Sequence, residues 1–261
     1  RNEFAHAVAQ VVFAFAPDEL LPVFTGVRIE IEGDTVSLLA TDRYRMALKE
    51  LTWSPTSTNV SATALVPAKV LADTARSMTA GEQVSLSLAS SGSGGAGDGI
   101  IGFEGSGSAG RRHTTTRLLD GEFPKVRHIM NAAAATDVCL HTSDLIAAAR
   151  RVSLVAERNT SLRMLLGDGS VTLEAATGDQ AQASEALEAT VDQIDSSVPQ
   201  LEAAGFNPTY LLDALGVFDT PYVNFAFTAP GKPCLLTGRA EPGGDPLGDY
   251  RHVIMLMRLP T

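Results

Sequence analysis

The chain has 261 residues, 44% of them hydrophobic, and this length and composition predict about two globular domains that can each bury a core. The formal net charge of −10 argues against a protein that is basic throughout and coats nucleic acid, although local charge decides contact. No apolar run is long enough for a transmembrane helix, and the two cysteines, Cys139 and Cys234, fit neither a disulfide framework nor a zinc site. We therefore expect a cytoplasmic protein without a membrane partner.

The first predicted element is an amphipathic helix that Pro17 ends. Its apolar residues recur mostly at three- and four-residue spacing: Phe4, Val8, Val11, Val12 and Phe15. Two alternating strands follow, joined by the turn Gly33-Asp34. A second helix is predicted for residues 67–78, and strands for 83–88, 99–103 and 113–118.

Two glycine-rich segments, 90–99 and 105–110, are predicted to be loops. Each contains the spacing of a dinucleotide-binding fingerprint, at 92–97 and at 105–110. That fingerprint works only between a strand and a helix, whereas strand-like sequence follows both loops, so we interpret them as hairpin loops. The five histidines show no metal-ligand spacing and no nucleophile motif occurs. The sequence thus predicts no catalytic residue, no metal and no cofactor.

The same pattern then occurs a second time. The segment that begins at Gly26 returns at Ser161, with Arg28 and Arg163 as equivalent positions 135 residues apart. The second copy opens with a helix over 145–155, for which Ser143-Asp144 is the expected cap. Strands are expected around a turn at 167–169, a helix after the cap Asn207, and strands at 222–227, 234–237 and 251–257, with a loop over 242–248.

Each copy therefore predicts an α+β domain of two helices on one side of an antiparallel sheet. A repeat of this length is a whole domain rather than a solenoid unit. The boundary is expected near the alanine-rich stretch 131–135, which gives domains of residues 1–130 and 131–261.

Basic side chains recur on the predicted helices, where a positive face suits a phosphate backbone and a solvated face is the alternative. These candidate DNA-facing residues are Lys69, Arg76, Arg150, Arg151 and Arg158. Asp73 is expected to pair with Lys69 at i, i+4. Arg111-Arg112 is more simply a solvated pair at the base of a hairpin.

Two further segments have no simple structural explanation. Residues 41–46 form a polar Thr-Asp-Arg-Tyr-Arg-Met cluster, whereas the second copy has Thr-Gly-Asp-Gln-Ala at 177–181. This difference at matched positions indicates a function that only the first copy performs. The methionine-rich tail 253–259 is either a final core strand or an adaptable peptide groove.

Several of these segments, taken in order, resemble the bacterial DNA polymerase III beta subunit, the sliding clamp. The resemblance rests on Gly26-Val27-Arg28, on residues 40–47, 118–124 and 205–213, and on the end Met255-Leu-Met-Arg-Leu259. It implies a non-catalytic protein of three similar domains per chain, which forms a head-to-tail homodimer around duplex DNA without sequence preference. This chain is similar to the second and third of these tandem clamp domains. The first domain would be missing, and the usual ring is not expected to close.

The resemblance also implies one peptide pocket per subunit, between the second and third domains. DNA polymerase III alpha subunit, clamp loader and other proteins with clamp-binding motifs would compete for it. The matching positions are Phe24, Thr41, Arg43, Tyr44, Arg45 and Met46 in the first copy, and Asn207, Tyr210, Cys234, Met255, Met257, Arg258 and Leu259 in the second.

Two departures from the family pattern affect the expected pocket rim. Leu256 replaces a usual proline, and residues 129–131 lack another, so we expect a looser rim. The alternative function is a clamp-fold adaptor that binds peptides and has no DNA function of its own.

Overall fold

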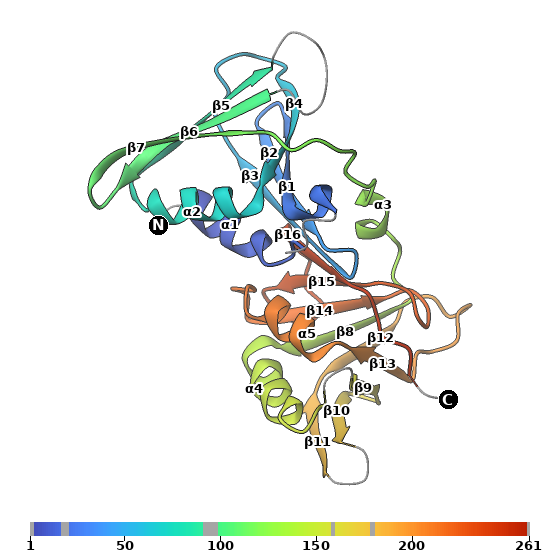
Figure 1. Cartoon of the computed structure of the whole chain (residues 1–261). Coiled ribbons are helices and arrows are strands. Elements are labelled where there is room, and N and C mark those ends of the chain that lie inside the picture. The colour runs from blue at the N-terminus through green and yellow to red at the C-terminus, as the bar shows by residue number, and fades with distance from the viewer. Residues whose placement is uncertain (1–2, 17–20, 91–98, 158–159, 178–180, 260–261) are drawn as a thin grey trace. The chain divides into compact units, whose positions relative to one another are not determined.

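The structure is a computed structural model that describes residues 3–16, 21–90, 99–157, 160–177 and 181–259 (Figure 1). Four features of the sequence analysis lie outside these residues: Pro17, the glycine loop at 92–97, Arg158 and residues 178–180 of the segment that corresponds to the 41–46 cluster. The chain divides into two compact units, Arg1–Lys125 and Val126–Thr261. This division comes five residues before the expected boundary, because the short helix α3 (Arg127–Met130) belongs to the second unit.

The described residues of the first unit form two antiparallel sheets and two α-helices. Its elements are α1 (Glu3–Val12), the 3-10 turn η1 (Pro22–Thr25), β1 (Gly26–Glu32), β2 (Thr35–Thr41), β3 (Arg45–Thr52), β4 (Ser61–Pro67), α2 (Ala68–Ser77), β5 (Ala80–Ser90), β6 (Gly99–Gly107) and β7 (Gly110–Arg117). The strand orders are β3-β2-β1-β4 and β5-β6-β7. Helix α1 packs beside α2 and on β2 and β3, while α2 contacts strands of both sheets.

The core of the first unit lies between these helices and the sheets. Ile29, Leu38 and Leu48 come from the four-stranded sheet, and Leu71 and Phe103 from α2 and β6; all five are almost completely buried. The alternating strands and the helical spacing predicted from the sequence therefore direct their apolar side chains to one interior.

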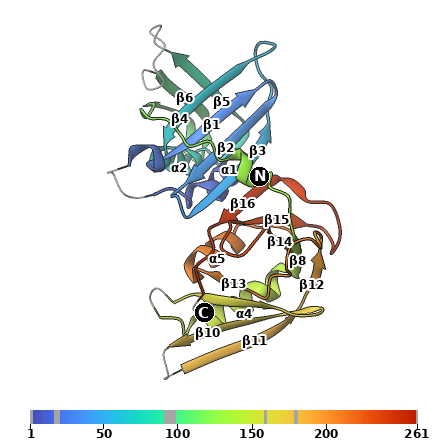
Figure 2. The same cartoon turned by 90° about the vertical axis from the view of Figure 1, so that its right-hand side faces the viewer.

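The second unit repeats the arrangement with one more helix and additional strands. Its elements after α3 are β8 (Thr136–His141), α4 (Thr142–Ser153), β9 (Leu162–Leu166), β10 (Ser170–Thr177), β11 (Ala181–Glu188), β12 (Thr190–Gln193), β13 (Ala203–Phe206), α5 (Pro208–Leu215), β14 (Tyr222–Phe227), β15 (Cys234–Arg239) and β16 (Leu247–Ile254). Within this unit the strand orders are β12-β8-β14-β15-β16 and β11-β10-β9-β13. Helices α4 and α5 pack against each other (Figure 2).

The α+β class and the repeat are confirmed, but each unit has two sheets rather than one. The Gly33-Asp34 turn joins β1 to β2, and the corresponding turn at 167–169 joins β9 to β10. The predicted strand over residues 222–227 matches β14. A β-bulge between Thr237 and Gly238 marks where β15 and β16 shift register.

The predicted cap of helix α4 is wrong. The helix begins at Thr142 with His141 in the N-cap position, so Ser143 and Asp144 lie in its first turn. Ser143 Oγ is hydrogen-bonded to His141 Nδ1 at 3.0 Å instead of capping a backbone amide. The physical reason is that β8 runs into α4 without a loop, so the cap position falls on His141, the last residue of the strand, whose side chain makes no capping hydrogen bond.

The predicted loop over 105–110 is largely strand. Strand β6 continues to Gly107, and β7 starts at Gly110. A Cβ at Gly105 would lie 3.1 Å from Met78 Sδ, and one at Gly107 would lie 2.3 Å from the Ser77 carbonyl oxygen. These glycines therefore allow the end of α2 to approach the strand, which is a packing role rather than a loop signal. Likewise, β16 begins at Leu247, inside the predicted loop 242–248.

Asn207 is a cap whose contribution to stability can be measured. Its Oδ1 accepts a hydrogen bond from the Tyr210 amide at 3.1 Å, and Pro208 occupies the first helical position. We expect Asn207→Ala to lower the free energy of unfolding by about 1 kcal/mol in urea titrations. Asn207→Asp, which keeps the acceptor, should lose much less; equal losses would contradict the capping role.

Candidate functional site

The cluster at 41–46 forms the tight turn between β2 and β3, and Asp42 organises it. Asp42 Oδ1 accepts hydrogen bonds from the Tyr44 amide at 3.0 Å and the Arg45 amide at 2.9 Å. Its Oδ2 accepts one from Arg45 Nε at 3.0 Å, and only 11% of each of these two side chains is exposed. Thr41 Oγ1 donates to the Arg45 carbonyl oxygen at 2.8 Å. The turn is therefore held by its own side chains, as an Asx turn is.

This turn presents cationic and aromatic groups next to each other. Arg43 adopts a left-handed φ of 79°, and its guanidinium carbon lies 5.5 Å from the centre of the Phe24 ring. The guanidinium carbon of Arg45 lies 5.3 Å from the centre of the Phe13 ring. Tyr44 at the tip is 56% exposed. Cation–π contacts fix both arginines while the tyrosine remains accessible, so the turn offers a preorganised surface.

The C-terminal tail of the second unit lies against strand β13. The Met257 amide donates to the Gly205 carbonyl oxygen at 2.8 Å, an isolated bridge beyond the end of β16. A Cβ at Gly205 would lie 2.9 Å from the Met257 carbonyl oxygen and 2.8 Å from Leu259 Cδ2, so a glycine lets the backbone of the tail approach β13 this closely. A strand was expected over residues 251–257, but β16 ends at Ile254. Beyond it, Met255, Met257 and Leu259 are half-buried.

Asn207 and Tyr210 lie directly after β13, at the start of α5. Because Asn207 is engaged in capping, its side-chain oxygen is fixed in place. Tyr210 is half-buried and Arg258 is exposed. The tail and the start of α5 thus form one candidate binding surface in the second unit. Its half-buried apolar groups are Met257, Leu259 and Tyr210.

Three predicted pocket residues are buried and do not offer contact surface in this structure. Cys234 has 0% exposure, Thr41 2% and Met46 3%. Burial raises the pKa of the Cys234 thiol well above its ordinary value, and it also raises the pKa of Cys139. Cys234 pairs with Ile254 across β15 and β16, so it supports the strand that leads into the tail.

The basic residues of helix α2 are exposed, but their pairing differs from the expectation. Asp73 forms its ion pair with Arg76, not with Lys69. Both spacings are possible on a helix, and the i, i+3 partner is the one used. Arg76 lies in the last turn, where a cation also stabilises the helix dipole, whereas Lys69 lies in the first turn, where the dipole disfavours it.

The basic residues of helix α4 lie in its last turn. Arg150 and Arg151 are both exposed there. Arg151 forms a bidentate ion pair with Glu185 of β11, with distances of 2.5 Å from Nε to Oε1 and 2.8 Å from Nη2 to Oε2. The hydrogen bond from Arg151 lowers the pKa of Glu185, so this carboxylate stays ionised and offsets part of the positive charge. Helix α4 ends at Ser153, so position 158 is not part of this helix and does not share a helical face with Arg151.

Arg111-Arg112 is exposed on the hairpin of β6 and β7, and Arg111 pairs with Glu104 on the neighbouring strand.

In the part of the chain that the structure describes, no group of histidine, cysteine and acidic residues is arranged to hold a metal ion. No helix among the described residues is long and apolar enough to cross a membrane.

Three residues that shape these surfaces were not among the predicted site residues: Asp42, Phe13 and Gly205. The first had a local signal, since an aspartate whose carboxylate caps amides two and three residues ahead is typical of an Asx turn. Phe13 and Gly205 had none, because their roles depend on groups distant in the sequence, Arg45 and Leu259 respectively.

Comparison with known proteins matches both units separately. Residues 1–125 match the family model of the DNA polymerase III beta subunit, central domain, and residues 127–258 match that of its C-terminal domain. The beta sliding clamp of Streptomyces coelicolor is 46% identical over 98% of this chain. The chain spans 65% of the length of that relative.

Solved structures share the fold. The DNA polymerase sliding clamp from Bacillus subtilis has a TM-score of 0.83 at 21% identity, over 98% of this chain and 62% of its own. A sliding clamp from Pseudomonas aeruginosa bound to griselimycin has a TM-score of 0.79 at 23% identity, over 98% of this chain and 63% of its own. At these identities the likeness establishes the fold alone.

The burial of Cys234 predicts its chemical behaviour. A neutral, enclosed thiol is a poor nucleophile, so in Cys139→Ser protein we expect the remaining thiol not to react with a disulfide reagent at pH 8. Unfolding in urea should expose it and give rapid, complete reaction. Rapid reaction in the native state would instead place Cys234 on an open surface.

Proposed function

Because this chain belongs to the family of the DNA polymerase III beta subunit, the bacterial sliding clamps, we propose that it is the part of a clamp that tethers polymerases to DNA and binds their peptides. The observation that carries this proposal is the separate match of both units to consecutive domains of that family. We propose a non-catalytic role within a longer protein that encircles duplex DNA as a head-to-tail dimer.

The charge distribution supports weak, sequence-independent contact with the phosphate backbone. Lys69 is exposed in the first turn of α2, where the helix dipole disfavours a cation. Helix stability therefore does not explain why a lysine occupies this position. Arg76 and Arg151 have carboxylate partners that reduce their attraction for phosphate. A protein that slides needs such sparse contacts, because a tight grip on phosphates would stop it.

The peptide-binding role is supported by two preorganised surfaces. The turn at 42–45 in the first unit holds Arg43 and Tyr44 in place through Asp42, and the tail in the second unit holds Met257 and Leu259 through Gly205. A small set of aromatic, arginine and apolar anchors is the usual composition of a binding hot spot. The griselimycin complex of the Pseudomonas aeruginosa clamp is consistent with a ligand groove on this fold.

Peptide binding can be tested with the chain itself. A fluorescent peptide of the Gln-x-Leu-x-Leu/Phe type should bind saturably in fluorescence polarisation. Met257→Asp introduces a charge among the apolar anchors, and Asp42→Ala releases the turn that positions Arg43 and Tyr44. We expect each variant to bind at least about tenfold more weakly, which corresponds to about 1.4 kcal/mol.

Matched controls separate the site from general damage. Leu247→Asp makes the same chemical change at an exposed position of β16, and Asp34→Ala removes a carboxylate from the other tight turn of this sheet. Both should bind as the unmodified chain does. No saturable binding by a folded chain would mean that replacement of the two usual prolines, one of them by Leu256, dismantled the pocket.

The DNA-facing residues can be tested in the longer protein, loaded on a primed circular template. Charge reversal at Lys69, Arg76, Arg150 and Arg151 should shorten the products of processive primer extension and lower DNA affinity by roughly tenfold or more near 0.1 M salt. Lys69→Glu alone should act in the same direction while leaving the helix folded, because an anion in the first turn suits the dipole.

The control reverses the two charges at Arg111 and Arg112 on the exposed hairpin and should leave extension unchanged. If the four reversals leave processivity and DNA affinity intact while peptide binding persists, the chain is a peptide adaptor without its own DNA function.

A further inference from the structure

The turn between β2 and β3 contains a long side chain in an unusual backbone conformation. Arg43 has a φ of 79°, in the left-handed region, and the other non-glycine residue with a positive φ in the described ranges is Asn59. Asparagine tolerates this region, whereas a long side chain is strained there because its Cβ crowds the carbonyl oxygen that follows. Position 43 therefore favours glycine or asparagine, but the sequence has an arginine.

The contacts of Arg43 within the chain do not explain this choice. Its guanidinium carbon lies 5.5 Å from the centre of the half-buried Phe24 ring, and the arginine is exposed. A cation–π contact at an exposed site contributes no more free energy than a left-handed non-glycine residue costs. Backbone strain that the fold itself does not offset is typical of residues that bind a ligand.

The two arginines of the turn differ in their charge partners. Arg45 Nε donates to Asp42 Oδ2 at 3.0 Å, and both side chains are only 11% exposed, so this positive charge is neutralised within the turn. The other oxygen of Asp42 accepts hydrogen bonds from the Tyr44 and Arg45 amides. Among the described residues, no carboxylate forms an ion pair with Arg43. The turn therefore presents one guanidinium whose charge is not compensated.

This guanidinium is held in place before a ligand arrives. The Arg43 amide donates to Thr41 Oγ1 at 3.2 Å, which fixes the backbone of the strained residue. Phe24, the platform beneath the guanidinium, lies in η1, where its amide donates to the Leu21 carbonyl oxygen at 3.0 Å and its carbonyl oxygen accepts from the Ala16 amide at 2.7 Å. A guanidinium stacked by its face leaves its N–H edge available, and that edge matches a carboxylate through two parallel hydrogen bonds.

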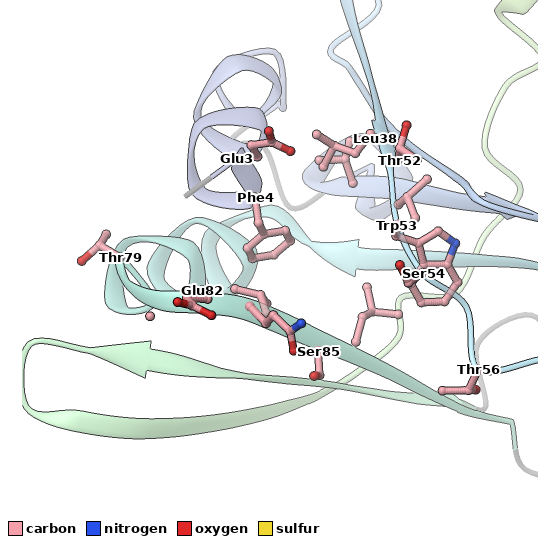
Figure 3. Close-up of a pocket in the computed structure, with 16 residues that line it drawn as sticks. Glu3, Phe4, Leu38, Thr52, Trp53, Ser54, Thr56, Thr79, Glu82 and Ser85 are labelled. Carbon is pink, nitrogen blue, oxygen red and sulfur yellow. The ribbon is translucent and has the colours of Figure 1, made fainter. Parts of the chain in front are cut away.

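The guanidinium lies on an open surface and not in a cavity. The first unit has a cavity of about 870 Å³, lined by residues of α1, β2, β5 and the end of β3 (Figure 3). No residue of the turn 41–46 lines it. An ion pair at Arg43 is therefore exposed to solvent, so salt screens it, and it discriminates between ligands more than it raises total affinity.

We propose that Arg43 is a specificity-determining residue of the peptide site and selects ligands that carry a carboxylate side chain next to their apolar anchors. The inference rests on the proposed peptide-binding function and names the class of ligand, an acidic peptide. The chain has a net charge of −10, so at long range it repels such a peptide. Selection of an acidic ligand consequently requires a cation at the point of contact, and Arg43 supplies it.

The test compares peptides that differ by one charge and little else. In the Gln-x-Leu-x-Leu/Phe peptide, each variable position and each flanking position carries Asp or Asn in turn, and fluorescence polarisation gives the Kd of each peptide. At one or more positions we expect the Asp peptide to bind about threefold or more tightly than its Asn counterpart near 0.1 M salt. This ratio should fall as the salt concentration rises.

Three variants assign the preference to its residue. Arg43→Gln removes the charge, and Arg43→Gly removes it while suiting the φ of 79°, so in both the Asp and Asn peptides should bind alike. Arg43→Gly should also unfold at no lower urea concentration than the unmodified chain, because glycine relieves the strain. Arg112→Gln is the matched control: it removes the same charge at an exposed hairpin position of this unit and should keep the preference.

The outcomes separate this inference from the peptide-binding function itself. If the Asn peptides bind saturably and Asp never improves binding, or if the preference survives in Arg43→Gln, the assignment of Arg43 is overturned while peptide binding stands. A clear loss of stability in Arg43→Gly would show that the fold requires the arginine and would overturn the argument from strain. If no peptide binds saturably, the peptide-binding function fails and the selection by Arg43 fails with it.

Discussion

Strand pairing that leads directly into a helix is the constraint on which each unit depends. In the second unit, β8 joins β12 to β14 and continues into α4 without a loop, so one segment satisfies two strand edges and sets where the helix begins. Buried backbone groups that lose such partners cost free energy comparable to a lost hydrogen bond.

Candidate binding groups are placed where this rigid framework ends. The turn between β2 and β3 carries Arg43 and Tyr44, and the chain beyond β16 carries Met257 and Leu259. A hydrogen bond fixes the backbone in both places. The Asp42 carboxylate accepts one from the Tyr44 amide in the turn, and the Gly205 carbonyl oxygen accepts one from the Met257 amide in the tail. Binding groups on short segments fixed by a scaffold lose little entropy when a ligand arrives.

The acidic total of −10 is compatible with DNA contact because the basic residues are local and partly compensated. Arg76 and Arg151 each pair with a nearby carboxylate, whereas Lys69 occupies a position that the dipole of its own helix disfavours. Attraction of this kind is long-ranged, depends on salt and has no sequence preference. It suits a protein whose proposed hold on DNA is topological.

Local information in the sequence determined the repeat, the α+β class and most element positions. Period-two strands around Gly33-Asp34 and the Asn207-Pro208 helix start depend on neighbours a few residues apart, so the sequence alone predicts them. Tertiary contact decided the rest. The 34-residue separation of Arg151 and Glu185 and the buried position of Cys234 depend on packing between segments distant in the chain. Residue pattern specifies which face of an element is apolar, but only the packed fold specifies which distant group meets that face.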